Sequence, residues 1–143
     1  MFNNYYMENI YRPFNNPNNI RQNNMNLYNP KVGYDYGNMF SNLYEGFENY
    51  KPTTLTGRNE KEDKLLEISR IAFACHDLKL FLDLNPNDTT MVTLYNDYKN
   101  KYKTSVDEYE RKYGVLSNES NALDKLPFRW VNEGWPWEED NYV

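Results

Sequence analysis

Apolar residues recur at helical spacing in two consecutive stretches of the chain. The first stretch begins after Asn59, which is a plausible helix N-cap, and acidic residues fill its first turn. The positions that define its apolar stripe are Leu65, Ile68, Ala72, Cys75, Leu78 and Leu82. Further apolar residues widen this stripe, so we expect a helix that must be covered on more than one side.

The second stretch predicts a second helix, packed antiparallel to the first. Pro86 disfavours helical geometry at Asn85 and so ends the first helix, while Asp88 is a good N-cap for the next. We expect the second helix to run from about Thr89 to Tyr113 and to stop at Gly114. Its seam consists of Met91 or Val92, Tyr95, Tyr98, Tyr102, Val106, Tyr109 and Tyr113. The short turn makes the helices neighbours, with tyrosine rings against the leucine stripe.

Residues 1–58 differ from this pattern. Asn and Tyr dominate, prolines interrupt the segment, and no helical or strand period of apolar residues persists. Such a segment buries too little to form a core alone, so we expect an extended or disordered arm that orders on a partner surface. A denser apolar set within it is expected to form a turn or two of helix and to bind a partner: Met39, Phe40, Leu43, Tyr44 and Phe47.

The end of the chain concentrates every tryptophan that the protein has. Residues 115–127 read as a loop with a helical turn near 121–125, and an extended segment containing Trp130, Trp135 and Trp137 follows. Each tryptophan can bury roughly 150–250 Å² of surface, so either the chain itself or a partner must cover them. The residues of this segment that we expect to bind a partner are Phe128, Trp130, Trp135, Pro136 and Trp137.

The sequence therefore predicts an all-α fold with three parts. These are an irregular Asn/Tyr-rich arm (1–58), an antiparallel two-helix hairpin (59–114), and a loop with an extended Trp-rich segment (115–143). The mean hydropathy of −0.98 and the 39% of hydrophobic residues predict a small core. Aromatic residues nevertheless make up 17% of the chain, and 14 of them are tyrosines, a composition that suits an assembling protein.

Charge and the chemistry-bearing residues narrow the function. A net charge of −5 argues against a nucleic-acid partner, and no apolar run approaches the roughly 18 residues of a membrane span. The N-terminal residues show no signal-peptide pattern, so we expect use inside the producing cell. With His76 and Cys75 as the single residues of their types, we expect no catalytic site, no metal site and no cofactor. Two alternatives for the aromatic residues stay open: a tryptophan strip that binds glycans, and oxidative cross-linking of tyrosines.

Several motifs of the chain resemble the CotJB family of spore coat proteins over roughly residues 60–138. They are Ala72-Phe-Ala, Asp77-Leu-Lys-Leu-Phe-Leu-Asp83, Asn85-Pro-Asn-Asp88, Tyr109-Glu-Arg-Lys-Tyr-Gly114, Trp130-Val and Trp135-Pro-Trp-Glu138. Typical members begin near the first helix, so the arm departs from the family pattern. Residues 37–52 of the arm are similar to the closing motif of the companion CotJA family.

The resemblance implies a protein that is made in the mother-cell cytoplasm of an endospore-forming bacterium and deposited in the spore coat. It also implies a partner, a coat protein that resembles manganese catalases (CotJC-like). The family offers no catalytic residue and no cofactor to carry over to this chain. We therefore expect a structural component that docks on this catalase-like protein, on copies of itself, or on both. A glycan-binding module of the spore surface is the alternative.

Overall fold

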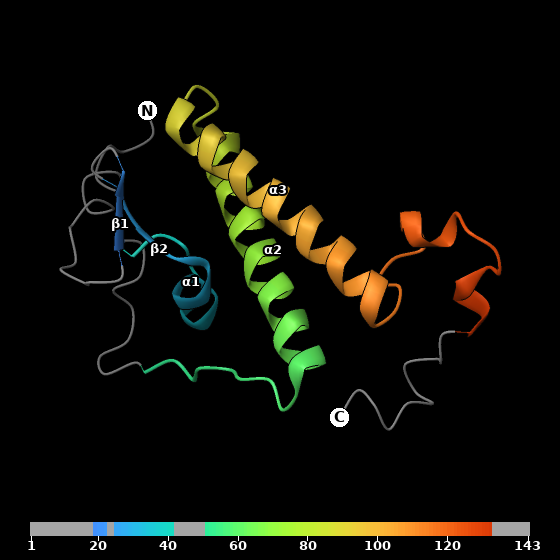
Figure 1. Ribbon diagram of the computed structural model, residues 1–143. Helices are drawn as coiled ribbons and strands as arrows, with labels where there is room; N and C mark the ends of the chain where they lie inside the picture. Colours follow the sequence, from blue (N-terminus) through green and yellow to red (C-terminus); the bar gives the residue numbers. More distant parts are fainter. Residues whose placement is uncertain (1–18, 23–24, 42–50, 133–143) are drawn as a thin grey trace.

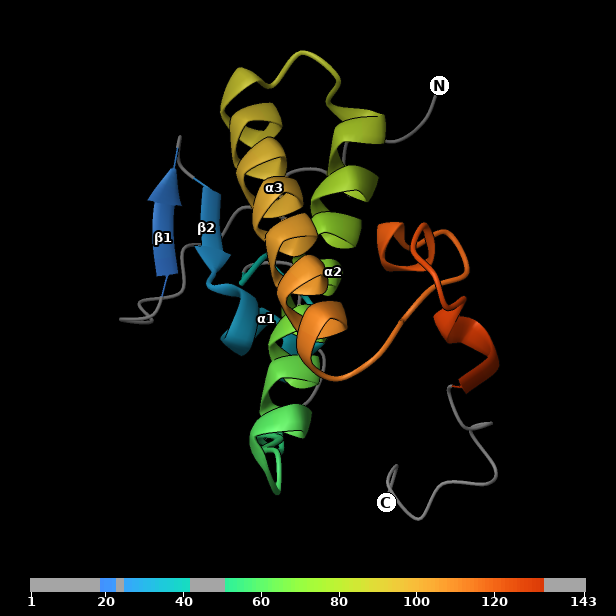
Figure 2. The same ribbon diagram turned by 45° about the vertical axis from the view of Figure 1, so that its right-hand side comes forward.

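The computed structural model describes residues 19–22, 25–41 and 51–132, and two long antiparallel helices dominate it (Figure 1). The elements are the strands β1 (Asn19–Gln22) and β2 (Met25–Tyr28), the helices α1 (Pro30–Tyr36), α2 (Glu60–Leu84) and α3 (Thr89–Lys112), and the 3-10 turns η2 (Asn121–Leu123) and η3 (Arg129–Asn132). In Figures 1 and 2 the hairpin stands between the β1–β2–α1 segment and the two 3-10 turns.

Side-chain caps mark the starts of both long helices, as the sequence predicts. The Asn59 side chain accepts the Glu62 N–H at 2.9 Å, and the Asp88 side chain accepts the Met91 N–H at 3.0 Å. Both bonds satisfy amide groups that have no partner inside the first turn of a helix. Helix α3 ends at Lys112, and Gly114 with φ of 140° lets the chain turn away. The predicted two-helix hairpin is confirmed, and its second helix ends one residue earlier than predicted, at Lys112 and not at Tyr113.

The core lies where α2 meets both α3 and the segment before residue 42. Its buried cluster consists of Leu27, Met39, Phe40, Ala74, Leu78, Met91 and Tyr98. Of the predicted interface residues, Ile68, Leu78, Tyr98 and Tyr109 are buried, whereas Leu65, Ala72, Cys75, Leu82, Tyr95 and Tyr113 are partly buried. Tyr102 is exposed at 37% of its surface and lies at the margin of the seam. Ala74, which the predicted stripe omits, is fully buried.

The described residues of the arm differ from the expected extended or disordered segment that orders on a partner surface, because they pack on their own chain. Strands β1 and β2 pair antiparallel, with Asn19 opposite Tyr28 and Gln22 opposite Met25. Helix α1 follows and packs on α2. Gly37, at φ of 73°, ends α1 and turns the chain back, so that residues 39–41 run antiparallel to β2. The described part of the arm covers a second apolar side of α2.

One hydrogen bond and one ring contact join this segment to α2. The Met39 N–H donates to Oδ2 of Asp77 at 2.7 Å, and the ring centroids of Phe40 and Phe81 are 5.1 Å apart. The Met39 side chain is fully buried. Met39 and Phe40 do not form the predicted helical turn, and the rest of that turn lies outside the described residues. Helix α2 is thus covered on one side by α3 and on another by α1 and β2.

Candidate docking surface

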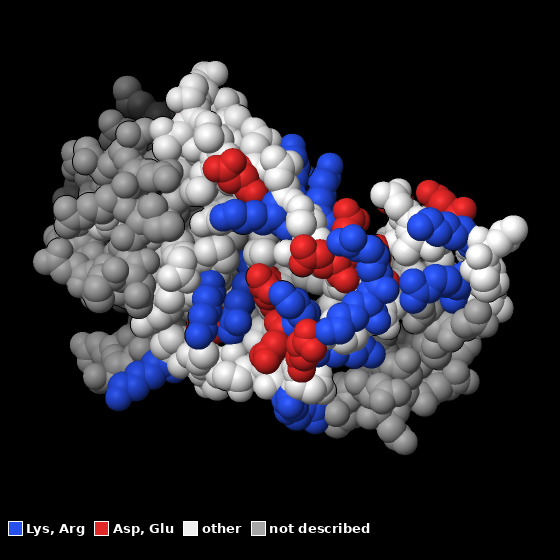
Figure 3. All heavy atoms as spheres, in the orientation of Figure 1, with Lys and Arg blue, Asp and Glu red and all other residues white. Residues whose placement is uncertain are grey.

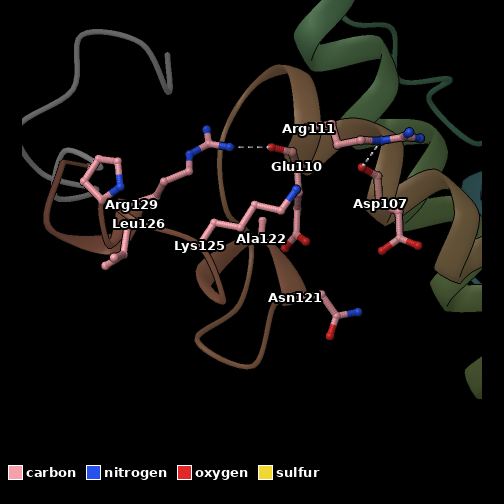
Figure 4. Close-up of a pocket in the computed structure, with 9 residues that line it drawn as sticks. Asp107, Glu110, Arg111, Asn121, Ala122, Lys125, Leu126 and Arg129 are labelled. Carbon is pink, nitrogen blue, oxygen red and sulfur yellow. Dashed lines mark hydrogen bonds between the residues drawn. The ribbon is translucent and has the colours of Figure 1, made fainter.

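A buried carboxylate holds the segment after α3 in place. Glu110, near the end of α3, is 4% exposed. Its carboxylate accepts the Leu116 N–H at 2.9 Å and also the hydroxyl of Ser120. Its backbone carbonyl accepts a longer bond of 3.4 Å from Nη1 of Arg129 (Figure 4). These bonds fix η2 and η3 beside the last turns of α3.

The fixed segment presents large apolar side chains to solvent. The exposed fractions are 96% for Leu126, 50% for Phe128, 43% for Trp130 and 77% for Val131. We call these four residues the apolar patch. Single exposed apolar residues are ordinary, but four large ones within six residues of the chain make this segment a candidate interaction site. The patch spans six residues of a segment that the fold already holds in place, so a partner need not order it.

A pocket of about 700 Å³ opens between α3 and this segment (Figure 4). Three cationic residues line it, Arg111, Lys125 and Arg129, together with the acidic Asp107 and Glu110. The remaining lining residues are Asn121, Ala122, Leu126 and Pro127, so Leu126 belongs to both the pocket and the apolar patch. We call this site the cation-rimmed pocket. Figure 3 shows Lys and Arg mixed with Asp and Glu over the hairpin, and both kinds of charge again on the segment beyond α3.

The predicted partner-binding residues fall into three groups. Phe128 and Trp130 are exposed, as a docking role requires. The prediction that Met39 and Phe40 bind a partner is wrong, because their own chain buries both side chains and leaves no surface for a partner. The others, Leu43, Tyr44, Phe47, Trp135, Pro136 and Trp137, lie outside the described residues. Their docking role stays a prediction, and so does a glycan-binding strip, which needs all three tryptophans.

The local conformation around Trp130 differs from the expected extended segment. Residues Arg129–Asn132 form the 3-10 turn η3, so the Trp130 ring projects from a helical turn. Leu126 and Val131 of the patch, and Arg111 and Lys125 of the pocket, were not among the residues predicted from the sequence. The high apolar density of residues 126–131 was a signal for the first pair. No sequence pattern indicates the second pair, since the return of the chain past α3 brings them together.

The remaining chemistry-bearing residues form no second site in the part of the chain that the structure describes. His76 is exposed on α2, and burial raises the pKa of the Cys75 thiol. In residues 19–22, 25–41 and 51–132, His, Cys, Asp and Glu side chains do not gather into a group that fits a metal ion. None of the described helices combines the length and the apolar character that a membrane span requires.

Comparison with known proteins assigns the chain to a family. The family model of the CotJB protein matches residues 62–138, which is more than half of the 143 residues. The match covers nearly all of α2, all of α3 and both 3-10 turns, and thus the whole candidate docking surface. No curated protein and no solved structure matches the chain significantly. The chain belongs to the CotJB family and is accordingly a spore coat protein.

Proposed function

We propose that this protein is a non-enzymatic structural component of the spore coat, made in the mother-cell cytoplasm, that docks on other coat proteins through its C-terminal segment. The apolar patch is the observation that carries this proposal. Its four large side chains are exposed on a segment that Glu110 holds against α3. A segment that is already anchored to its own fold loses less conformational entropy when it binds, and aromatic anchors contribute much of the affinity of protein interfaces.

The partners that we propose are a coat protein resembling manganese catalases and copies of this chain. The resemblance of the motifs to CotJB proteins supports the first partner, because it implies a catalase-like protein encoded alongside. Low hydropathy together with high aromatic content supports assembly in general. Metal chemistry in such a complex belongs to the catalase-like partner.

Binding of the purified catalase-like coat protein tests the proposal. The variant combines Phe128→Ser with Val131→Ser, and its control combines Leu80→Ser with Leu84→Ser. The control residues are similarly exposed, at 52% and 84%, but lie on the far half of α2. We expect the patch variant to bind more weakly, with a dissociation constant raised by roughly 10–100-fold, as the loss of interface anchors does. The control should bind like the unchanged chain.

Calorimetry or biolayer interferometry measures both dissociation constants. A full-length chain that ignores the catalase-like protein at micromolar concentration would contradict docking on that partner. Equal losses in the patch variant and the control would show that the apolar patch is not the contact.

A further inference from the structure

The cation-rimmed pocket and a later stretch of the same sequence are chemically complementary. Residues Trp135-Pro-Trp-Glu-Glu-Asp140 place three consecutive carboxylates directly after two indole rings. We propose that the cation-rimmed pocket of one copy binds this acidic, tryptophan-bearing segment of a second copy, which makes the protein a reciprocal dimer. This inference rests on the proposed function, because it names one of the contacts by which the coat component assembles.

Positive charge at the pocket is available for a ligand. Nε of Arg111 donates to the Asp107 carbonyl at 3.1 Å, which orients the guanidinium, and both Arg111 and Lys125 are exposed. Neither cation forms a salt bridge with another residue that the structure describes. Both cations line the same pocket, in a protein whose net charge is −5. An arriving carboxylate gains charge-assisted hydrogen bonds there without displacing an existing ion pair.

The acidic residues that line the pocket do not cancel this charge. The Glu110 carboxylate is buried and accepts hydrogen bonds from Leu116 and Ser120, so it is engaged within its own chain. Asp107 is exposed and remains the one acidic group at the pocket that no described side chain engages. With Arg129, the lining carries three cations against the two carboxylates of Asp107 and Glu110, and so has an excess of one positive charge. The Glu-Glu-Asp sequence has the sign that this excess attracts.

The apolar part of the pocket suits the tryptophans that precede the carboxylates. Leu126 is almost fully exposed, and Ala122 and Pro127 line the pocket beside it. A volume of about 700 Å³ lies within the roughly 300–1,000 Å³ that is typical of ligand sites. Pro136 biases Trp135 towards an extended conformation, and an extended peptide places its apolar and charged groups in sequence along a pocket. Both halves of the segment thus find matching chemistry.

The position of the pocket favours a second copy over the chain's own segment. Arg129 lines the pocket, and the described chain ends three residues later at Asn132. Only Glu133 and Gly134 separate Asn132 from Trp135, so few residues are available to lead the segment back into the pocket that Arg129 of the same chain lines. A neighbouring copy offers its pocket without this constraint. Because Arg129 lines the pocket three residues before the described chain ends, two copies can exchange the residues that follow about a two-fold axis.

Charge reversal in full-length chains tests the contact. The pocket variant carries Arg111→Glu and Lys125→Glu, and the segment variant carries Glu138→Lys and Glu139→Lys. Sedimentation velocity should show that the unchanged chain forms a dimer and that high salt weakens it. Each variant alone should have a dimer dissociation constant that is roughly tenfold higher or more. A mixture of the two variants should dimerise again, because both exchanged contacts then pair opposite charges. A contact within one chain cannot be restored by mixing.

The control variant, Lys79→Glu with Lys103→Glu, changes the net charge equally at exposed positions away from the pocket. It should dimerise like the unchanged chain, and circular dichroism should show the same helix content in all variants. The proposal is overturned if the unchanged chain is a monomer at every concentration, if either reversed variant dimerises normally, or if the mixture stays monomeric. These outcomes leave binding of the catalase-like protein through Phe128 and Val131 untouched, so the two proposals fail separately.

Discussion

At the scale of single residues, Glu110 shows how a polar side chain organises the docking surface. Among the residues that the structure describes, it is the one charged side chain that is buried. Its carboxylate joins α3 to Leu116 and Ser120, and so decides where η2 and η3 lie. The sequence did not reveal this role, because Glu110 resembles the solvated acids of any helix. Burial arises only when the loop returns, and helical periodicity does not encode that return.

We expect Glu110→Ala to destabilise the fold by about 2–3 kcal/mol, because the part-buried Leu116 amide and the Ser120 hydroxyl lose a charged acceptor. Urea unfolding measures the change in the free energy of unfolding. Hydrogen exchange should show faster exchange of the Leu116 amide in this variant. Glu108→Ala, at an exposed position of the same helix, should change stability by less than about 0.5 kcal/mol. Equal effects of the two substitutions would argue against an anchoring role.

At the scale of elements, local signals predicted the hairpin and long-range contacts escaped prediction. Asn59 and Asp88 mark helix starts through bonds within their own first turns, so the sequence alone locates α2 and α3. Helix α1 begins with a similar local signal, an N-cap at Asn29 followed by Pro30. The Asn29 side chain accepts the Val32 N–H. The bond between Met39 and Asp77 joins residues 38 positions apart, and no local pattern announces it.

An ion pair between Lys112 and Glu60 closes the open end of the hairpin. The Nζ and Oε1 atoms are 2.6 Å apart, and this bond lowers the pKa of Glu60 below its usual 4.5. Because the folded pKa is lowered, the stabilisation is present above pH 4.5 and is lost as the pH falls through the folded pKa. The same bond raises the pKa of Lys112 above 10.5, so the stabilisation is also lost at strongly alkaline pH.

We expect Glu60→Gln to lower the melting temperature slightly at neutral pH and to have no effect in acid, where Glu60 is protonated. The effect is small because both side chains are exposed to solvent and its ions. Thermal unfolding at neutral pH and at acid pH below the lowered pKa of Glu60, followed by circular dichroism, measures the difference between the two proteins. Glu108→Gln is the control. A difference that persists unchanged in acid would assign the effect to something other than this ion pair.

At the scale of the whole molecule, the hairpin and the described part of the arm share one core. Helix α2 is apolar on two sides, and Leu27, Met39 and Phe40 complete the side that α3 leaves open. The width of its apolar stripe predicted that α2 must be covered on more than one side. The sequence did not reveal that the arm supplies part of this cover, because the apolar residues of the arm lack a period and their packing depends on contacts far apart in the chain.

We expect Met39→Ala to destabilise the hairpin itself by about 2–5 kcal/mol, as other losses of fully buried side chains do. Leu84→Ala, at a position that is 84% exposed, should be nearly neutral. Urea unfolding followed by helical circular dichroism provides the measurement, since its signal comes mainly from α2 and α3. Unchanged helix stability in Met39→Ala would show that the arm and the hairpin unfold independently.

The antiparallel course of α2 and α3 has a practical consequence for studying coat assembly. A helix of 25 residues is about 37 Å long, so the turn at 85–88 lies at the opposite pole from η2 and η3. A fluorophore or affinity tag inserted at Asn87 would therefore stand clear of both proposed contacts. Such a label could report where the protein sits in the coat of a living sporulating cell while leaving its binding end unobstructed.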